Sequence, residues 1–183
     1  MYIPDSERLA YELVSDKHSE FLWSIDQDEQ VMKFINGGEK TSREDIEGIF
    51  IPRIKAFSNP ALGWGVWKVT EKASTEDIGW ILVRPMLFFT ATPQSDNLEL
   101  GWRFKRDTWG KGYATEAART VRDSLFDMGV EQFSAIALPE NEASIAVMKK
   151  LGMEFSHKMH YQDEVFNGEV VVYQQDLSKI LSF

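Results

Sequence analysis

The sequence predicts an α+β fold, a mixed and mostly antiparallel sheet with helices on both faces. Apolar and polar residues alternate from Leu98 to Lys105, which is the period of a strand. Apolar residues then recur at helical spacing from Ala114 to Met128, and Gly129 stands where a helix commonly ends. The short apolar run 133–138 predicts a buried strand. Two strands joined by a crossover helix are normally parallel neighbours, so a parallel pair is expected in the sheet.

The chain before this unit contains a strand, two helices and a hairpin. A strand is expected at 9–14, and Ser15 or Asp16 would cap a helix over 18–25. Thr41 and Glu44 have the spacing of a capping box, and they open a helix whose apolar residues recur to residue 57. Two strands follow at 63–69 and 78–84 with a hairpin connection between them, and Pro85 is expected to end the second.

The remaining elements flank the central unit. The loop 86–97 carries an apolar patch, residues 86–89, which is either a buried loop or strand extension, or a dimer contact or substrate wall. Asn141 is expected to cap a helix that runs to Leu151. Residues 153–161 and 170–177 predict two more strands, with a turn between them that contains Asn167 and Gly168.

Composition excludes several classes of function. A chain of 183 residues, 43% of them hydrophobic, fits a single domain over residues 1–183. Because it has no cysteine, disulfides, thiolate metal sites and an acyl-cysteine intermediate are excluded. The net charge of −9 argues against nucleic-acid binding, and the three histidines form no metal pattern. No basic start or membrane-length apolar run is present, so we expect a cytoplasmic protein that binds no membrane.

The turn between the strand at 98–105 and the following helix carries the main functional signal. It reads Trp109-Gly110-Lys111-Gly112-Tyr113-Ala114. Two glycines let the backbone approach a ligand closely, and the first N–H groups of a helix are unpaired and carry partial positive charge. The turn therefore predicts an anion site, for a diphosphate.

Three segments together resemble a known family. They are residues 109–118, WGKGYATEAA, then 141–144, NEAS, and 150–153, KLGM. Their order and separation resemble the GNAT superfamily of acyl-CoA N-acyltransferases, and within it the Rim-type branch that acetylates ribosomal-protein N-termini. Residues 7–9 and 31–35 also look like the opening segments of that branch, so the resemblance spans most of the chain. It implies the GNAT fold, in which the central parallel strands are splayed apart.

The resemblance also implies an activity, that of an acetyl-CoA-dependent N-acetyltransferase without a metal, working by direct attack in a ternary complex. The acceptor would be a protein N-terminus or a small amine such as a polyamine or aminoglycoside. Phe34, Phe50 and Phe57 fall in the region that covers the acceptor site in the family, with ordinary core as the alternative. A homodimer is possible.

The resemblance assigns cofactor contacts residue by residue. The thioester and pantetheine go to the backbone of Trp102, Arg103 and Phe104, beside a bulge that Gly101 suggests. The diphosphate goes to backbone N–H groups of the turn and the helix start, namely Trp109, Gly110, Lys111, Gly112, Tyr113, Ala114 and Thr115. Asn141 is assigned to the pantetheine, with helix capping as its alternative. Where the family often has Gln or Arg, this chain has Trp109; Lys111 and Arg106 would compensate or be solvated.

Glu99 is the candidate general base, because it matches a glutamate of the Rim-type branch. It also lies seven strand residues before Arg106, roughly 23 Å at about 3.3 Å per residue, the order of length needed by an extended thiol arm. The alternative is a solvated residue on the polar face of the strand. For the general acid, many members carry a tyrosine where this chain has Met148, which cannot donate a proton. Ser144, one turn earlier, is the nearest alternative, as acid, cofactor contact or helix-start residue. The absence of the tyrosine and the two interpretations of Glu99 leave a second function open, a catalytically silent acyl-CoA-binding module.

Overall fold

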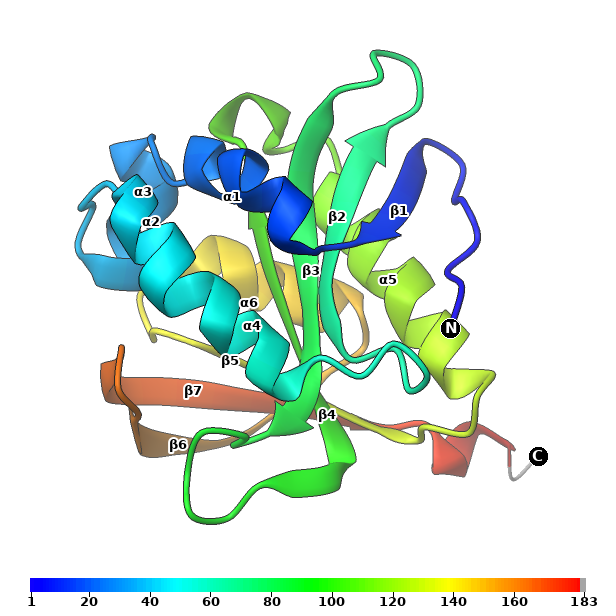
Figure 1. Cartoon of the computed structure of the whole chain (residues 1–183). Helices are drawn as coiled ribbons and strands as arrows, with labels where there is room; N and C mark the ends of the chain where they lie inside the picture. The colour runs from blue at the N-terminus through cyan, green and yellow to red at the C-terminus, as the bar shows by residue number, and fades with distance from the viewer. Residues whose placement is uncertain (182–183) are drawn as a thin grey trace.

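A seven-stranded sheet runs through the molecule in the order β1-β2-β3-β4-β5-β7-β6 (Figure 1). The structure is a computed structural model that describes residues 1–181. The strands are β1 Leu9–Leu13, β2 Gly65–Glu71, β3 Asp77–Met86, β4 Gln94–Phe104, β5 Gln132–Ala137, β6 Glu154–Gln162 and β7 Asn167–Asp176. Neighbours pair antiparallel except β4 and β5, which are parallel. This arrangement confirms the predicted fold class.

Helices cover both faces of the sheet (Figure 1). One group consists of α1 Ser19–Ile25, α2 Glu29–Asn36, α3 Arg43–Asp45, the π-helical segment η2 Ile46–Phe50 and α4 Ile51–Phe57; the other consists of α5 Tyr113–Phe126 and α6 Glu142–Lys150. Three short 3-10 helices, η1 Asp16–His18, η3 Arg106–Thr108 and η4 Ser178–Leu181, complete the order. Among the described residues, no helix is both long enough and apolar enough to span a membrane.

The sheet has a hydrophobic core on each face. Because side chains alternate along a strand, successive β4 residues point to opposite faces. Leu98, Leu100 and Phe104 point to the core that α5 and α6 cover. The smaller core lies under α1, η2 and α4, where Leu22, Ile46, Ile51 and Phe57 pack against Val66. The second face of β4, which carries Glu99, is therefore covered as well, so both faces of the central strands are enclosed.

The central parallel pair separates soon after it forms. β4 and β5 pair over three rungs only, and the last joins Glu99 to Ser134. Both strands continue beyond that rung, β4 to Phe104 and β5 to Ala137, without pairing to each other. The predicted splay is thus present. The bulge expected at Gly101 is wrong, since Gly101 pairs in register with Leu82 and the β3–β4 register shifts at Pro85 and Met86 instead.

Several predicted boundaries are wrong for local reasons. Pro85 does not end β3, because the strand continues to Met86 through the register shift. β4 begins at Gln94, four residues before the start of its clean alternation. The cap of α3 is Ser42, whose Oγ accepts from the Asp45 N–H at 3.0 Å, and not Thr41. α2 was not anticipated.

The turn after β6 is shorter than predicted. Asn167 and Gly168 pair with Gln162 and Tyr161 and so belong to β7. The turn is instead organised by Asp163, whose Oδ1 accepts from the N–H groups of Val165 and Phe166 at 2.8 and 2.9 Å. This is an Asx-type turn, in which a side chain replaces a backbone acceptor.

Candidate active site

The turn before α5 has the backbone that the sequence predicts. Gly110 and Gly112 have φ of +72° and +80°, in the left-handed region that favours glycine. The N–H of Glu116 donates to the Gly112 carbonyl at 3.0 Å, so the N–H groups of Tyr113, Ala114 and Thr115 precede this first helical bond. With the helix dipole behind them, these donors form an anion-binding start of a helix.

Side chains fix this turn to the rest of the molecule. The Trp109 indole Nε1 donates to the Phe104 carbonyl at 2.9 Å, which ties the turn to the end of β4. Arg8 donates to the Lys111 carbonyl at 2.9 Å and pairs with Glu116 at 2.7 Å. Trp109 thus supplies an anchor at the position where the family often has a cation. Arg106 pairs with Asp28 at 2.9 Å.

A cavity of about 430 Å³ extends from this turn along the end of β4 to α2 and α6. It brings together almost all of the residues predicted to bind the cofactor. Those in its lining are Trp102, Arg103, Phe104, Trp109, Gly110, Gly112, Tyr113, Ala114, Thr115, Asn141 and Ser144. Lys111 is outside this lining, and its carbonyl is taken by Arg8. The binding roles of these residues stay predictions, whereas their convergence on one cavity is a structural fact.

The start of α6 forms one wall of this cavity. Asn141 caps the helix, because its Oδ1 accepts from the Ser144 N–H at 3.2 Å. This bond uses the side-chain carbonyl oxygen of Asn141, so the amide nitrogen takes no part in the cap. Met148 is fully buried in the core and outside the cavity lining, so a tyrosine at position 148 would not reach the cavity by simple replacement. Ser144, Ala146 and Val147 are the α6 residues that line the cavity near the middle of the helix.

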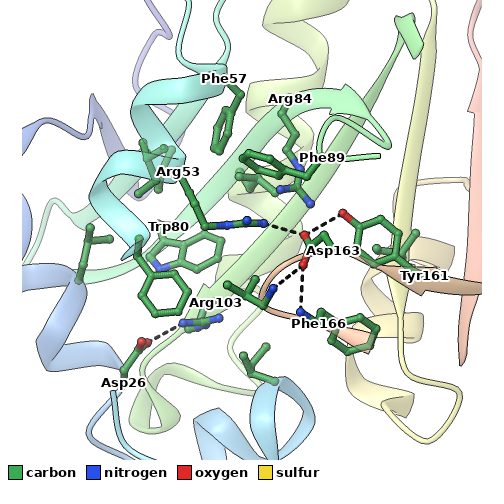
Figure 2. Close-up of a pocket in the computed structure, with 18 of the residues that line it drawn as sticks. Asp26, Arg53, Phe57, Trp80, Arg84, Phe89, Arg103, Tyr161, Asp163 and Phe166 are labelled. Carbon is green, nitrogen blue, oxygen red and sulfur yellow. Dashed lines mark hydrogen bonds and ion pairs between the residues drawn. The ribbon is translucent and has the colours of Figure 1, made fainter. Parts of the chain in front are cut away.

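A second cavity, of about 290 Å³, lies between α1–α4 and the sheet and reaches the turn between β6 and β7 (Figure 2). It shares three lining residues with the first cavity, Phe34, Ile35 and Arg103, so the two meet beside β4. Phe34, Phe50 and Phe57, predicted to be near the acceptor, all line it. Of the apolar patch at 86–89, Met86 is the buried last residue of β3, and the other three residues are half-buried. Phe89 forms another wall of the cavity, and its ring packs against Phe57.

Three arginine–carboxylate pairs surround this second cavity. Arg53 Nη2 lies 2.6 Å from Asp163 Oδ2, Arg103 Nη1 lies 2.6 Å from Asp26 Oδ1, and Arg84 contacts both Glu99 oxygens at 2.9 and 3.1 Å. Figure 2 shows the first two as dashed lines, with Asp26 at the lower left of the view and Asp163 to the right of its centre. Aromatic rings lie against the same guanidinium groups, with Arg53 3.8 Å from the centre of the Phe89 ring and Arg103 5.0 Å from that of Trp80.

Glu99 is buried, so its interpretation as a solvated strand residue is wrong. Its exposed fraction is 3%, and it lies opposite Arg84 across the β3–β4 pair. Burial lowers the pKa of Arg84, but the charge and hydrogen bonds of Glu99 outweigh it and raise that pKa. Glu99 itself is outside the lining of both cavities, and Arg84 lies between it and the second cavity. Its position at the last rung of the parallel pair places it where the strands begin to separate.

Asp163 is the most heavily bonded carboxylate in this region. Besides Arg53 and two backbone N–H groups, its Oδ2 accepts from the Tyr161 hydroxyl at 3.1 Å (Figure 2). Burial would raise the pKa of Asp163, but the Val165 N–H and the Arg53 charge hold it below its usual value. Burial also raises the pKa of Tyr161 to about 12, so its hydroxyl stays neutral at physiological pH. The β6–β7 turn is thereby fastened to α4 across the cavity.

Sequence reasoning missed the charged residues of this cavity. Asp26, Arg53, Arg84 and Asp163 come from four separate segments, and no local motif marks any of them. The only usable signal was strand register, because Arg84 and Glu99 would be opposed if the β3–β4 hairpin pairing were known. Among residues 1–181 no three His, Asp or Glu side chains form a metal-binding group, and the absence of a metal cofactor stays a prediction.

Comparison with curated proteins gives relatives at about 30% identity. An FsC-acetyl coenzyme A-N(2)-transacetylase of Aspergillus fumigatus is 29% identical over 80% of this chain and 62% of its own length. The Bacillus subtilis protein YkkB is 33% identical over 62% of this chain and 63% of its own length. Another Bacillus subtilis protein, the N-acetyltransferase YnaD, is 30% identical over 81% of this chain and 80% of its own length. The chain thus spans less than two thirds of the first two relatives.

Solved structures share the fold at lower identity. An aminoglycoside acetyltransferase in complex with coenzyme A has a TM-score of 0.77 at 16% identity, covering 94% of this chain and 97% of that one. A ribosomal α-N-protein acetyltransferase in complex with coenzyme A has a TM-score of 0.71 at 14% identity, covering 97% and 98%. Both ribosomal-protein and aminoglycoside enzymes are therefore structural neighbours, and the fold does not select between their acceptors.

The family model for the acetyltransferase (GNAT) domain matches residues 8–154. This match contains the turn before α5, the splayed strands and the start of α6. The match confirms the predicted superfamily and supports acyltransferase as the class of enzyme. The chain belongs to the family of GNAT acetyltransferase domains.

Proposed function

We propose that the protein is an acetyl-CoA-dependent N-acetyltransferase that acetylates a primary amine, at a protein N-terminus or in a small molecule, by direct attack in a ternary complex. The observation that carries the proposal is the meeting of two cavities beside β4. One begins at the free N–H groups of α5, and the other is enclosed by apolar and paired charged side chains. A donor ligand and an acceptor can therefore occupy separate cavities and still contact each other.

The first cavity fits the donor substrate by its chemistry. The backbone N–H groups from Gly110 to Thr115 suit a diphosphate, whereas the predicted Trp109 N–H already donates to the Arg106 carbonyl at 3.1 Å. The indole Nε1 of Trp102, which lines the cavity, is buried and has no hydrogen-bond partner. A buried donor left unpaired is costly, so an acceptor atom on the ligand is expected there, such as an amide carbonyl of the pantetheine arm. Beyond Glu99, β4 still pairs with β3, and its edge toward β5, which is unpaired there, is available to the same arm.

The protein's task in the reaction is orientation and proton transfer. Acetyl-CoA would supply the thioester whose acetyl group is transferred. The neutral amine forms the new C–N bond as the C–S bond breaks; the nitrogen loses one proton and the departing thiolate gains one. Glu99 is the proposed base, reached through water because Arg84 contacts both of its oxygens. Ser144 is the proposed donor to the thiolate, although a thiol with a pKa of about 8.5 can also leave unaided.

The test is CoA release in the presence of a panel of primary amines, with native protein and Glu99→Gln. General-base catalysis typically contributes about 10² to 10⁴ in rate, so we expect a kcat loss in that range with an unchanged affinity for acetyl-CoA. A variant that loses melting temperature but keeps the native kcat would assign Glu99 a structural role beside Arg84.

A silent binding module is the second candidate, favoured by the engagement of both Glu99 oxygens and by the burial of Met148. Acetyl-CoA binding without turnover of any amine would support it. Glu142→Gln is a matched control for Glu99→Gln, because Glu142 is exposed at the start of α6. That control should change neither binding nor turnover by more than about twofold, since exposed single charges contribute little.

A further inference from the structure

The second cavity offers no free negative charge to an acceptor. Two carboxylates line it, Asp26 and Asp163, and each is within 2.6 Å of an arginine. Glu99, behind the wall, is also taken by an arginine. A polycation such as a polyamine would have to be held by carboxylates that are already neutralised. Although the chain carries a net charge of −9, this cavity does not share that character.

Free hydrogen-bond donors are present instead. Within residues 1–181, the buried side-chain nitrogen and oxygen atoms without a partner are Arg53 Nη1, Arg103 Nε and Trp102 Nε1. All three are N–H donors, and both arginines line the second cavity. Glu164 Oε2 lies 3.6 Å from Arg53 Nη1, which is too long for a hydrogen bond, and its side chain is 90% exposed. A buried donor without a partner is costly, so an acceptor oxygen is expected from a ligand.

Apart from Arg84, Tyr161 and Trp80, the rest of the lining is apolar and includes the ring of Phe50. The rings of Phe57, Phe89 and Phe166 surround Arg53, which carries the free Nη1 (Figure 2). Charge-assisted hydrogen bonds from arginine to a carboxylate are roughly twice as strong as neutral ones. Nη2 of Arg53 donates to Asp163, so Nη1 is the guanidinium nitrogen left for a ligand.

We propose that the acceptor is a compact primary amine with an apolar body and a carboxylate, and that the carboxylate accepts a hydrogen bond from Arg53 Nη1. This inference rests on the proposed function, because it names the substrate class of the same site. Arg103 lines both cavities, so its free Nε is a donor near the point where amine and thioester must meet. An α-amino acid with an apolar side chain combines these features, because its amine and carboxylate are close together and its body is apolar. A peptide N-terminus, which carries a neutral amide carbonyl in place of the carboxylate, is the competing class of substrate.

The experiment compares matched amines that differ in the oxygen group, with each rate expressed per neutral amine because that group also changes the pKa of the amine. Two series are used: leucine, leucinamide and isoamylamine, and phenylalanine, phenylalaninamide and phenethylamine, with spermidine as a polycation. CoA release gives kcat/KM for each. We expect the carboxylate form to exceed the amide by about tenfold or more, chiefly through KM, because a charge-assisted bond is lost in the amide. An amide equal to or better than its acid, or spermidine as the best substrate, would overturn the inference.

Arg53→Lys sharpens the assignment, because lysine keeps the charge beside Asp163 and removes the second branch of the fork. The ratio of kcat/KM for the acid to that for the amide should fall to below about threefold, because the variant lacks the charge-assisted bond to the carboxylate. Arg43→Lys is the control, since Arg43 is exposed and pairs with Glu20 outside both cavities; its ratio should equal that of native protein. An unchanged ratio in Arg53→Lys would overturn the role of Nη1. Turnover without any carboxylate preference refutes this inference alone, whereas no turnover of any amine refutes the proposed function and the inference with it.

Discussion

The two cavities of this protein are built from different parts of the chain. The cavity at α5 depends on backbone: left-handed glycines, unpaired N–H groups and the unpaired edge of β4. The cavity under α1–α4 depends on side chains, since three arginine–carboxylate pairs join segments up to 110 residues apart. A backbone site tolerates side-chain change and can serve one common ligand. A site made from long-range pairs can be altered residue by residue, which suits a variable acceptor.

The first way to break this comparison is Asp163→Asn, which should destabilise the fold most. Removing one partner from a buried ion pair costs about 3–5 kcal/mol in the free energy of unfolding. Because the pKa of Asp163 is lowered in the fold, its contribution is fully present above the unfolded value of about 3.9 and is lost as pH falls through the lowered pKa. In urea unfolding, the free energy of unfolding of the variant should therefore be well below that of native protein at pH 7 and close to it near pH 3.

Asp16→Asn is the control for this prediction. Asp16 also pairs with an α4 residue, Lys55 at 2.8 Å, but both side chains are more than 60% exposed. Exposed pairs contribute about 0–1 kcal/mol, so its unfolding should differ little from native protein at either pH. Equal destabilisation by the two variants would mean that the buried pair does not hold α4 to the β6–β7 turn.

The second prediction addresses the backbone site. Gly112→Trp should weaken acetyl-CoA binding by about 10- to 100-fold in calorimetry, because the side chain crowds the phosphate approach and removes one or two charge-assisted bonds. Gly129→Trp is the matched control, since Gly129 also has positive φ but lies at the far end of α5 with open space around it. Both variants strain the backbone, and only the first should lose affinity. Unchanged affinity in Gly112→Trp would contradict the phosphate assignment.

The contrast between the cavities also explains what the sequence could predict. The turn before α5 is encoded within six consecutive residues, so its conformation and its place at a helix start were predicted correctly. The pairing of α4 with the β6–β7 turn joins Arg53 and Asp163, which no periodicity or motif connects. Glu99 lies in the middle of β4, and its interpretation as a solvated residue failed because alternation describes one covered face and cannot reveal that α1–α4 cover the other. The strand end predicted at Pro85 and the bulge predicted at Gly101 were wrong for a related reason. Pairing with the neighbouring strands, and not the single residue, decides where a strand ends or bends.

A third and smaller prediction separates the two roles of Asn141. Asn141→Ser keeps a capping oxygen and loses the amide donor, whereas Asn141→Ala loses both. We expect Asn141→Ala to lower the free energy of unfolding by about 1 kcal/mol and Asn141→Ser to change it by less than about 0.5 kcal/mol. If the amide contacts the pantetheine, both should weaken acetyl-CoA binding by roughly 3- to 10-fold, the worth of one neutral hydrogen bond. Full affinity in Asn141→Ser would leave Asn141 as a helix cap only.

The smallest effect is expected for Trp109→Phe, and it tests whether the backbone site is independent of its side chains. Phenylalanine keeps the ring and removes the Nε1 donor to the Phe104 carbonyl. Loss of one neutral hydrogen bond should lower the free energy of unfolding by about 1 kcal/mol, measured in urea. Acetyl-CoA affinity should fall by less than about threefold, because the backbone donors that bind the phosphates remain. A loss above tenfold would show that the turn needs its indole anchor to hold the phosphate-binding conformation, and the contrast between a backbone cavity and a side-chain cavity would then fail at this residue.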